Sequence, residues 1–194
     1  MREFMRRVPI KAGKRGKDDE KDLVRDILRK WPKLIAWLEE KEYFTAPASK
    51  DHHGAHEGGL IEHSLQVAYE LERITVKMGL KWERPESPEI IGLLHDVCKL
   101  DDYYAVSLEE PRKIEYEYKK ERLYPGHGDK SLIMLMGLID LTEEEKMCIR
   151  YHYGSVHRKV RMGVLQPGGA EIPECSVDTY SRYDSFSDKG RVKV

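Results

Sequence analysis

The chain is poor in cysteine, has almost no net charge and contains no long apolar run. Its three cysteines show no paired spacing, which argues against a disulfide scaffold and favours reduced, buried thiols (Cys98, Cys148 and Cys175). No window approaches the roughly 18 uninterrupted apolar residues of a membrane-spanning helix, and the N-terminus lacks the apolar core of a signal peptide. The formal net charge of −1 gives no overall bias toward nucleic acid or membrane. We therefore expect a cytoplasmic protein without membrane association.

The 194 residues, 40% of them hydrophobic and 36% charged, are sufficient for one soluble globular domain. Residues 1–17 differ from the rest, because they carry seven basic residues against a single acid, Glu3. Such an arm is either flexible and solvated or in contact with the phosphates of a nucleic acid. The predicted organisation is a basic arm over 1–17, one domain over 18–188 and a short tail over 189–194.

Apolar residues recur at helical spacing through most of the chain, which predicts an all-α, compact, single-domain fold. The expected helices cover 18–31, 32–43, 59–78, 87–97, 129–139, 142–152 and 174–187. Pro32 suits a first helical turn, Asp129 can cap a helix, and Thr142 with Glu145 forms a capping-box pattern. Residues 113–118 alternate as in an exposed strand, so a small β-hairpin is expected around 110–124.

Histidines and aspartates form an ordered series of candidate metal ligands: His63, His95, Asp96, His127, His152 and Asp184. Imidazole and carboxylate ligands without paired cysteines suit a catalytic metal centre for phosphate chemistry. Neighbouring helical residues point about 100° apart, so His95 and Asp96 can hold one ion only where a helix meets a cavity. A hydrogen-bonded pair that ends a core helix is the alternative for these two residues alone. Four buried-looking histidines in one small domain favour metal binding.

Three further side chains are predicted to contact a phosphorylated substrate. Lys99 shares a helix face with His95, and its ammonium could neutralise a phosphate oxygen beside a metal. Lys130 is a second phosphate contact, and His53 lies in a polar loop that could line the substrate entrance. Ordinary solvated surface positions are the alternative for all three.

Several of these motifs together resemble the HD-domain metal-dependent phosphohydrolases. The motifs are Gly58-Gly59-Leu60-Ile61-Glu62-His63-Ser64 and Leu94-His95-Asp96-Val97-Cys98-Lys99, followed by a distant aspartate. Gly126-His127-Gly128-Asp129 and Arg150-Tyr151-His152-Tyr153 are similar to the additional histidine motifs of the dinuclear branch. The resemblance covers about residues 44–188 and implies a helical HD-domain fold with one or two divalent ions.

By this resemblance, His63, His95, Asp96 and Asp184 would hold the first ion, with Asp178 and Asp188 as alternatives to Asp184. Asp96 would bridge to a second ion held by His127 and His152. The ligands fit Mn, Fe, Ni, Co or Mg without choosing among them. Water activated by the metal would then cleave a phosphate ester, with Asp96 and Lys99 as the predicted catalytic residues.

The predicted function is a metal-dependent phosphohydrolase that acts on a small phosphorylated substrate resembling a nucleotide. The segments 46–53 and 58–60 also resemble the 3′-to-5′ exoribonuclease branch, whose members usually carry a β-barrel ahead of the catalytic domain. A non-catalytic module that senses nucleotides is a second alternative. A structural metal combined with nucleic-acid contact through residues 1–17 is a third.

Overall fold

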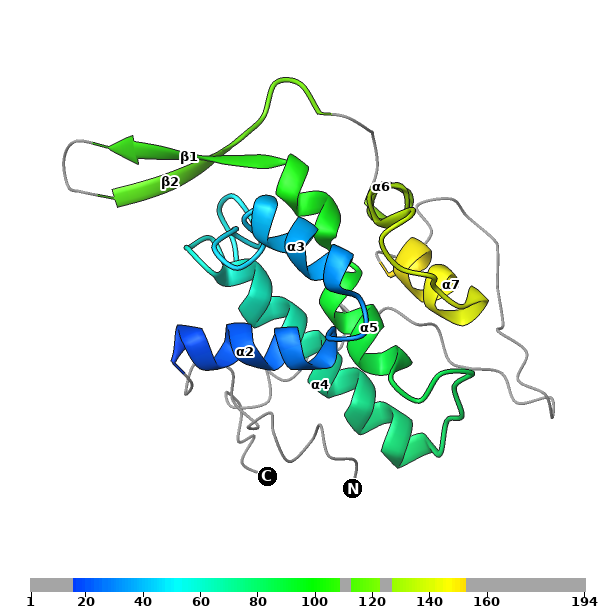
Figure 1. Ribbon diagram of the computed structural model, residues 1–194. Helices are drawn as coiled ribbons and strands as arrows, with labels where there is room; N and C mark the ends of the chain where they lie inside the picture. Colours follow the sequence, from blue (N-terminus) through cyan, green and yellow to red (C-terminus); the bar gives the residue numbers. More distant parts are fainter. Residues whose placement is uncertain (1–15, 109–112, 123–126, 153–194) are drawn as a thin grey trace, which may run out of the picture.

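The computed structural model describes residues 16–108, 113–122 and 127–152. Within these ranges there are six α-helices, four of them packed around a central pair, and one antiparallel hairpin projects from the helices (Figure 1). In chain order the elements are α2 (Lys17–Ile27), α3 (Pro32–Glu40), α4 (Gly59–Met78), α5 (Ser87–Leu94), the 3₁₀ helix η1 (Val97–Asp101), β1 (Tyr103–Leu108), β2 (Lys113–Tyr118), α6 (Gly128–Leu135) and α7 (Glu143–Tyr151). The prediction of a mostly helical protein with a small hairpin is confirmed.

Local signals set several helix boundaries as the sequence predicts. Pro32 occupies the first turn of α3, where its missing N–H costs nothing. Before α7, the Thr142 hydroxyl accepts from the backbone N–H of Glu145, whose carboxylate accepts from the Thr142 N–H in return. Helix α4 ends at Met78 because Gly79 adopts the left-handed conformation, with φ of 65°.

Other boundaries differ from the predictions. The two strands of the hairpin cover 103–108 and 113–118, whereas the hairpin was expected around 110–124, because the first strand lacks the alternation that marks the second. Asp129 lies inside the first turn of α6 and does not cap it, and the helix stops at Leu135, two residues before the left-handed Gly137. Lys17 belongs to α2 rather than to the arm, and the expected helix over 174–187 lies outside the described residues.

Helices α4 and α5 form the centre of the molecule and pack along each other (Figure 1). Their contact is unusually close, because a Cβ on Gly92 would lie only 2.3 Å from the Ala68 Cα. Apolar side chains from both helices fill the surrounding core, including Leu60, Val67, Leu71, Ile90, Leu93 and Leu94. No helix in the described part of the chain is both long and apolar enough to cross a membrane.

A second close contact joins α6 to α7. A Cβ on Gly128 would lie 2.1 Å from the carbonyl oxygen of Arg150, so only glycine allows this approach. The α6–α7 pair in turn packs against α5 and η1. Gly92 lies three residues before His95, and Gly128 directly follows His127, so the two close contacts bring three separate chain segments with predicted ligands to one place.

Candidate metal centre

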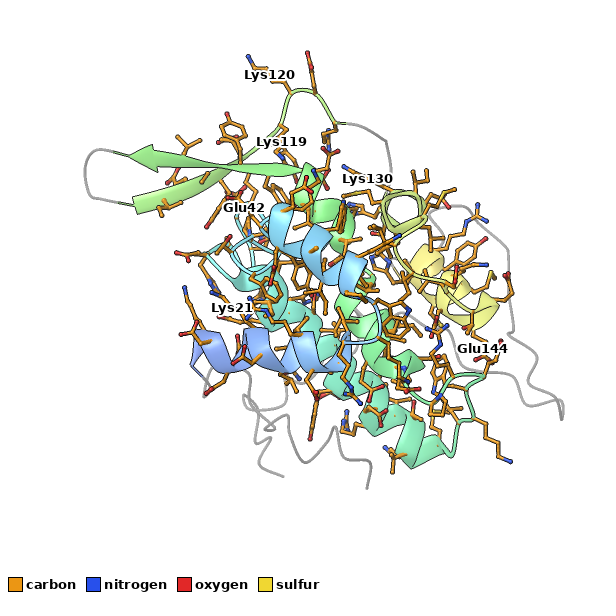
Figure 2. All side chains as sticks on the ribbon, viewed as in Figure 1. Lys21, Glu42, Lys119, Lys120, Lys130 and Glu144 are labelled. Carbon is orange, nitrogen blue, oxygen red and sulfur yellow. The ribbon has the colours of Figure 1, made fainter. Side chains whose placement is uncertain are left out.

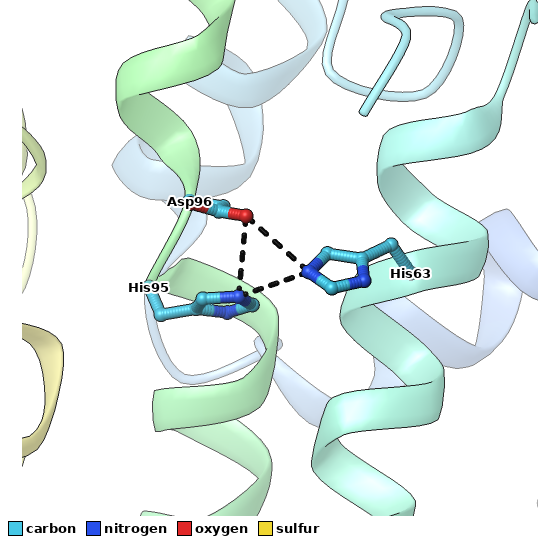
Figure 3. A group of neighbouring side chains, drawn as sticks. All are labelled: His63, His95 and Asp96. Carbon is cyan, nitrogen blue, oxygen red and sulfur yellow. Dashed lines mark hydrogen bonds and ion pairs between the residues drawn. The ribbon is translucent and has the colours of Figure 1, made fainter. Parts of the chain in front are cut away.

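Three predicted ligands meet between α4 and the end of α5 (Figure 3). His63 Nε2 lies 3.2 Å from His95 Nε2, and each of these nitrogens lies 3.3 Å from Asp96 Oδ2. Ligand atoms held about 2.1 Å from one ion lie about 3.0 Å apart at right angles and about 3.4 Å apart at the tetrahedral angle. The three atoms are therefore spaced as ligands of a single ion would be.

The backbone explains how the neighbours His95 and Asp96 reach the same point. Helix α5 ends at Leu94, and Asp96 leaves the helical conformation with φ of −110° and ψ of 19° before η1 begins. The Ser131 hydroxyl donates to the His95 carbonyl oxygen at 2.7 Å and accepts from the Cys98 N–H at 3.2 Å. This hydroxyl holds the break between the two helices, so both ligand side chains turn toward α4.

His152 brings a third imidazole from the end of α7. Its Nε2 lies 3.2 Å from Asp96 Oδ1, while His63 and His95 face Oδ2 of the same carboxylate. His152 is 1% exposed and Asp96 is fully buried. The two oxygens of Asp96 thus face different imidazoles, which is the arrangement expected of a bridging carboxylate.

Backbone carbonyls determine which ring nitrogen carries the proton in two of these histidines. His95 Nδ1 lies 2.9 Å from the Gly92 carbonyl oxygen, and His152 Nδ1 lies 2.7 Å from that of Ile149. A carbonyl oxygen only accepts, so both Nδ1 atoms must donate, and the Nε2 atom of each neutral ring carries a lone pair. Histidines bound to metals characteristically donate their other ring N–H in this way.

The ionisation states of His95 and Asp96 also suit metal ligands. Burial lowers the pKa of His95 despite the opposing charge of Asp96, so its imidazole is neutral near pH 7. Burial would raise the pKa of Asp96, but His95, His152 and His63 together outweigh it and hold that pKa well below its ordinary value. The centre therefore presents a carboxylate anion surrounded by imidazole nitrogens.

Lys99 places a positive charge next to the Asp96 carboxylate. Its Nζ lies 2.5 Å from Asp96 Oδ2, and its side chain is 12% exposed. The ammonium therefore stands beside the candidate ligands, as the predicted phosphate contact requires. The contact with a phosphate itself stays a prediction.

His127 lies in a second group of potential ligands. One ligand atom each from Asp96, Cys98 and His127 falls within 4.8 Å of the others, so the two groups share Asp96. The Cys98 Sγ lies 3.4 Å from His127 Nδ1. Burial raises the pKa of the Cys98 thiol to about 12, and burial also lowers the pKa of His127. The sequence predicts Cys98 only as a buried thiol, although its position two residues after Asp96 is a signal that could have identified it as a ligand.

The remaining predicted site residues are not brought into these groups. His53 is exposed in the loop before α4. Lys130 of α6 (labelled in Figure 2) is buried, and its Nζ lies 2.8 Å from both Asp101 Oδ2 and Asp102 Oδ1. Two aspartates thus balance the charge that was predicted to meet a phosphate. Asp184 lies outside the described residues, as do its alternatives Asp178 and Asp188.

No protein-family model, curated protein or solved structure gives a significant match to this chain. The resemblance to HD-domain phosphohydrolases therefore stays a prediction drawn from the motifs. The function proposed below is therefore inferred from the geometry of the candidate metal centre.

Proposed function

We propose that the protein is a metal-dependent phosphohydrolase whose centre is built from His63, His95, Asp96 and His152. The observation that carries this proposal is the convergence of three imidazoles on one buried carboxylate, with two of the rings oriented by backbone carbonyls. The HD-domain fold is part of the proposal.

A cation accounts for this convergence better than hydrogen bonds do. As neutral rings, His95 and His152 direct Nε2 lone pairs at the Asp96 carboxylate, and acceptors facing acceptors repel one another in a buried site. The imidazoles stabilise this anion only when a cation, either a proton or a metal ion, lies among them. Protonating His95 would relieve the repulsion, but burial lowers its pKa. A divalent ion held by His63, His95 and Asp96 would accept the lone pairs of both imidazoles and of the carboxylate, and mixed imidazole and carboxylate ligands suit Mn²⁺, Fe²⁺, Co²⁺, Ni²⁺ or Zn²⁺.

Two features favour a catalytic over a structural metal. Structural zinc sites are usually closed by four ligands rich in cysteine, whereas this centre is rich in histidine and carboxylate. His63 and Lys99 are also partly exposed, with 23% and 12% of their side-chain surface accessible. A substrate group can therefore approach the ligands from their side of the centre.

The residues of the centre would bind the metal ion and the substrate in separate roles. His95, His152 and Asp96 are rigidly positioned by burial and by their backbone contacts, so they would hold the ion without rearrangement. Lys99 would exchange its contact with Asp96 for one with a phosphate oxygen and neutralise the charge that develops there. A bound divalent ion would polarise the phosphoryl group and lower the pKa of an attacking water.

A small substrate fits this arrangement better than an internal position of a long polymer. The carboxylate at the centre is fully buried, so a terminal phosphate reaches it more readily than a phosphate flanked on both sides. We therefore propose a phosphate ester of a nucleotide-like molecule. The motifs of the loop before α4 keep an exoribonuclease-like phosphodiesterase as the second candidate.

The test is an assay of the full chain loaded in turn with Mn²⁺, Fe²⁺, Co²⁺, Ni²⁺, Zn²⁺ and Mg²⁺. Nucleoside mono-, di- and triphosphates, dinucleotides and short RNA serve as substrates. We expect turnover of the small substrates, its loss in Asp96→Asn, and a reduced kcat in Lys99→Met. Lys146→Met, which removes an exposed lysine paired with Glu143, is the matched control.

Each other outcome points to a different function. Preferential hydrolysis of RNA would favour the exoribonuclease-like candidate. Binding of nucleotides without turnover under any metal would favour a sensing module. No binding of metal and no turnover would refute the proposal.

A further inference from the structure

A second group of potential ligands, Cys98 and His127, shares Asp96 with the proposed metal centre. Cys98 is fully buried, and its sulfur lies 3.4 Å from His127 Nδ1. The Oδ1 atom of Asp96 is also buried and accepts no hydrogen bond of acceptable geometry from the described residues. A carboxylate oxygen of Asp96 lies within 4.8 Å of ligand atoms of Cys98 and His127. A buried carboxylate beside a thiol and an imidazole is a site that a cation would stabilise.

We propose that Cys98 is a thiolate ligand of a second metal ion, held together with Asp96 and His127, and that its sulfur makes this position prefer Zn²⁺, Fe²⁺ or Co²⁺ over Mg²⁺. The inference rests on the proposed metal-dependent function and adds to it a ligand and a metal preference. The thiol would release its proton to solvent as the metal–sulfur bond forms.

The spacing of the two donor atoms supports coordination. Zinc lies about 2.3 Å from a cysteine sulfur and about 2.0 Å from a histidine nitrogen, so tetrahedral ligands of these types lie about 3.5 Å apart. The observed separation of 3.4 Å between Sγ and Nδ1 matches this value. The ligand atoms of Asp96 complete a group that one ion can bridge.

The backbone holds Cys98 in this position. Its N–H donates to the Ser131 hydroxyl, and the same hydroxyl donates to the His95 carbonyl oxygen. His127 is the residue immediately before α6. Gly128, the first residue of α6, packs closely against the Arg150 backbone of α7. The packing of η1 against α6 and of α6 against α7 therefore brings Cys98 and His127 together.

Sulfur changes which metals the centre would select. Oxygen and nitrogen ligands alone accept Mg²⁺ and Mn²⁺ as well as the later transition metals. Thiolate is a soft ligand that favours zinc, iron or cobalt, and Mg²⁺ strongly prefers oxygen. The alternative is a simple hydrogen bond from the Cys98 thiol to His127 Nδ1, with no metal role for the sulfur.

Titration of the full chain with Co²⁺ separates these readings, because a thiolate bound to cobalt gives a charge-transfer absorption band in the near ultraviolet. We expect the band in the wild type and its absence from Cys98→Ser. The double variant Cys148→Ser/Cys175→Ser keeps Cys98 as its sole thiol, so it should retain the band. This variant tests the sulfur even if Cys98→Ser does not fold. Excess Mg²⁺ should leave the band unchanged.

Two results would overturn the inference. One is cobalt bound to the wild type without the band, which would leave the metal-dependent function standing. The other is a band that disappears from Cys148→Ser/Cys175→Ser while cobalt is still bound. Absence of any bound cobalt would instead refute the metal centre as a whole.

Discussion

Replacing Gly92 by alanine should separate α4 from α5 and weaken metal binding. The new Cβ would lie 2.3 Å from the Cα and 2.4 Å from the N of Ala68. Since non-bonded carbons require about 3.5 Å, the helices must move apart by roughly 1 Å. Gly92 lies three residues before His95, and Ala68 lies five residues after His63, so the separation between these ligands should grow by a similar amount.

The expected magnitudes follow from this displacement. Overpacking should lower the unfolding free energy by about 1–3 kcal/mol. The better helix propensity of alanine offsets about 1 kcal/mol of this loss. Ligand atoms must be held within about 0.5 Å for full affinity, so we expect metal affinity to fall about 10- to 100-fold. Calorimetric titration with Co²⁺ and thermal unfolding without metal measure the two effects.

Gly79→Ala is the matched control for this experiment. Gly79 has a φ of 65° and no neighbouring atom within 4 Å of an added Cβ, so the change costs about 1–2 kcal/mol through backbone strain alone. Metal affinity should be unchanged in this variant. Wild-type affinity in Gly92→Ala would refute the argument, as would restoration of affinity by Ala68→Gly, because the clash involves the backbone of residue 68.

Three other measurements test the energetics of the structure. Zn²⁺ or Co²⁺ at about one hundred times the Kd should raise the unfolding free energy by about 2.7 kcal/mol, with EDTA reversing the gain and Asp96→Asn showing none. Lys130→Met should cost about 3–5 kcal/mol in urea unfolding, because it leaves two aspartates without their buried partner, whereas the exposed Lys146→Met should cost less than about 1 kcal/mol. Because the pKa of the folded Cys98 thiol is raised to about 12, the folded protein keeps a proton that the unfolded chain loses above about pH 9. Metal-free stability should therefore fall by about 1 kcal/mol between about pH 9 and about pH 10, and Cys98→Ala should lack this part of the decline. A pH profile of Cys98→Ala that parallels the wild type would contradict the assignment of that proton.

Signals confined to neighbouring residues predicted the helices well. The bounds of α4 agree at both ends, since an apolar stripe defines its face and Gly79 ends it. The capping box at Thr142 likewise predicts where α7 begins. The first strand of the hairpin was missed because only its pairing with β2 makes it a strand, and its partners lie 5 to 15 positions away along the chain.

The candidate site was predicted as a set of residue types, and the tertiary structure decided which of them meet. His63, His95, Asp96 and His152 converge as expected, because two close helix contacts, at Gly92 and Gly128, bring their three segments together. Neither contact could be inferred from local periodicity, which gives the inward face of a helix but not its partner.

The partners of Cys98 and Lys130 also could not be predicted from the sequence. The sequence by itself determined that both lie near apolar residues and near the ligand motifs. Only the fold decided that the thiol faces His127 and that the ammonium is enclosed by Asp101 and Asp102. The reason is physical: helical periodicity is a property of adjacent residues, whereas the partner of a buried polar group depends on how distant helices pack.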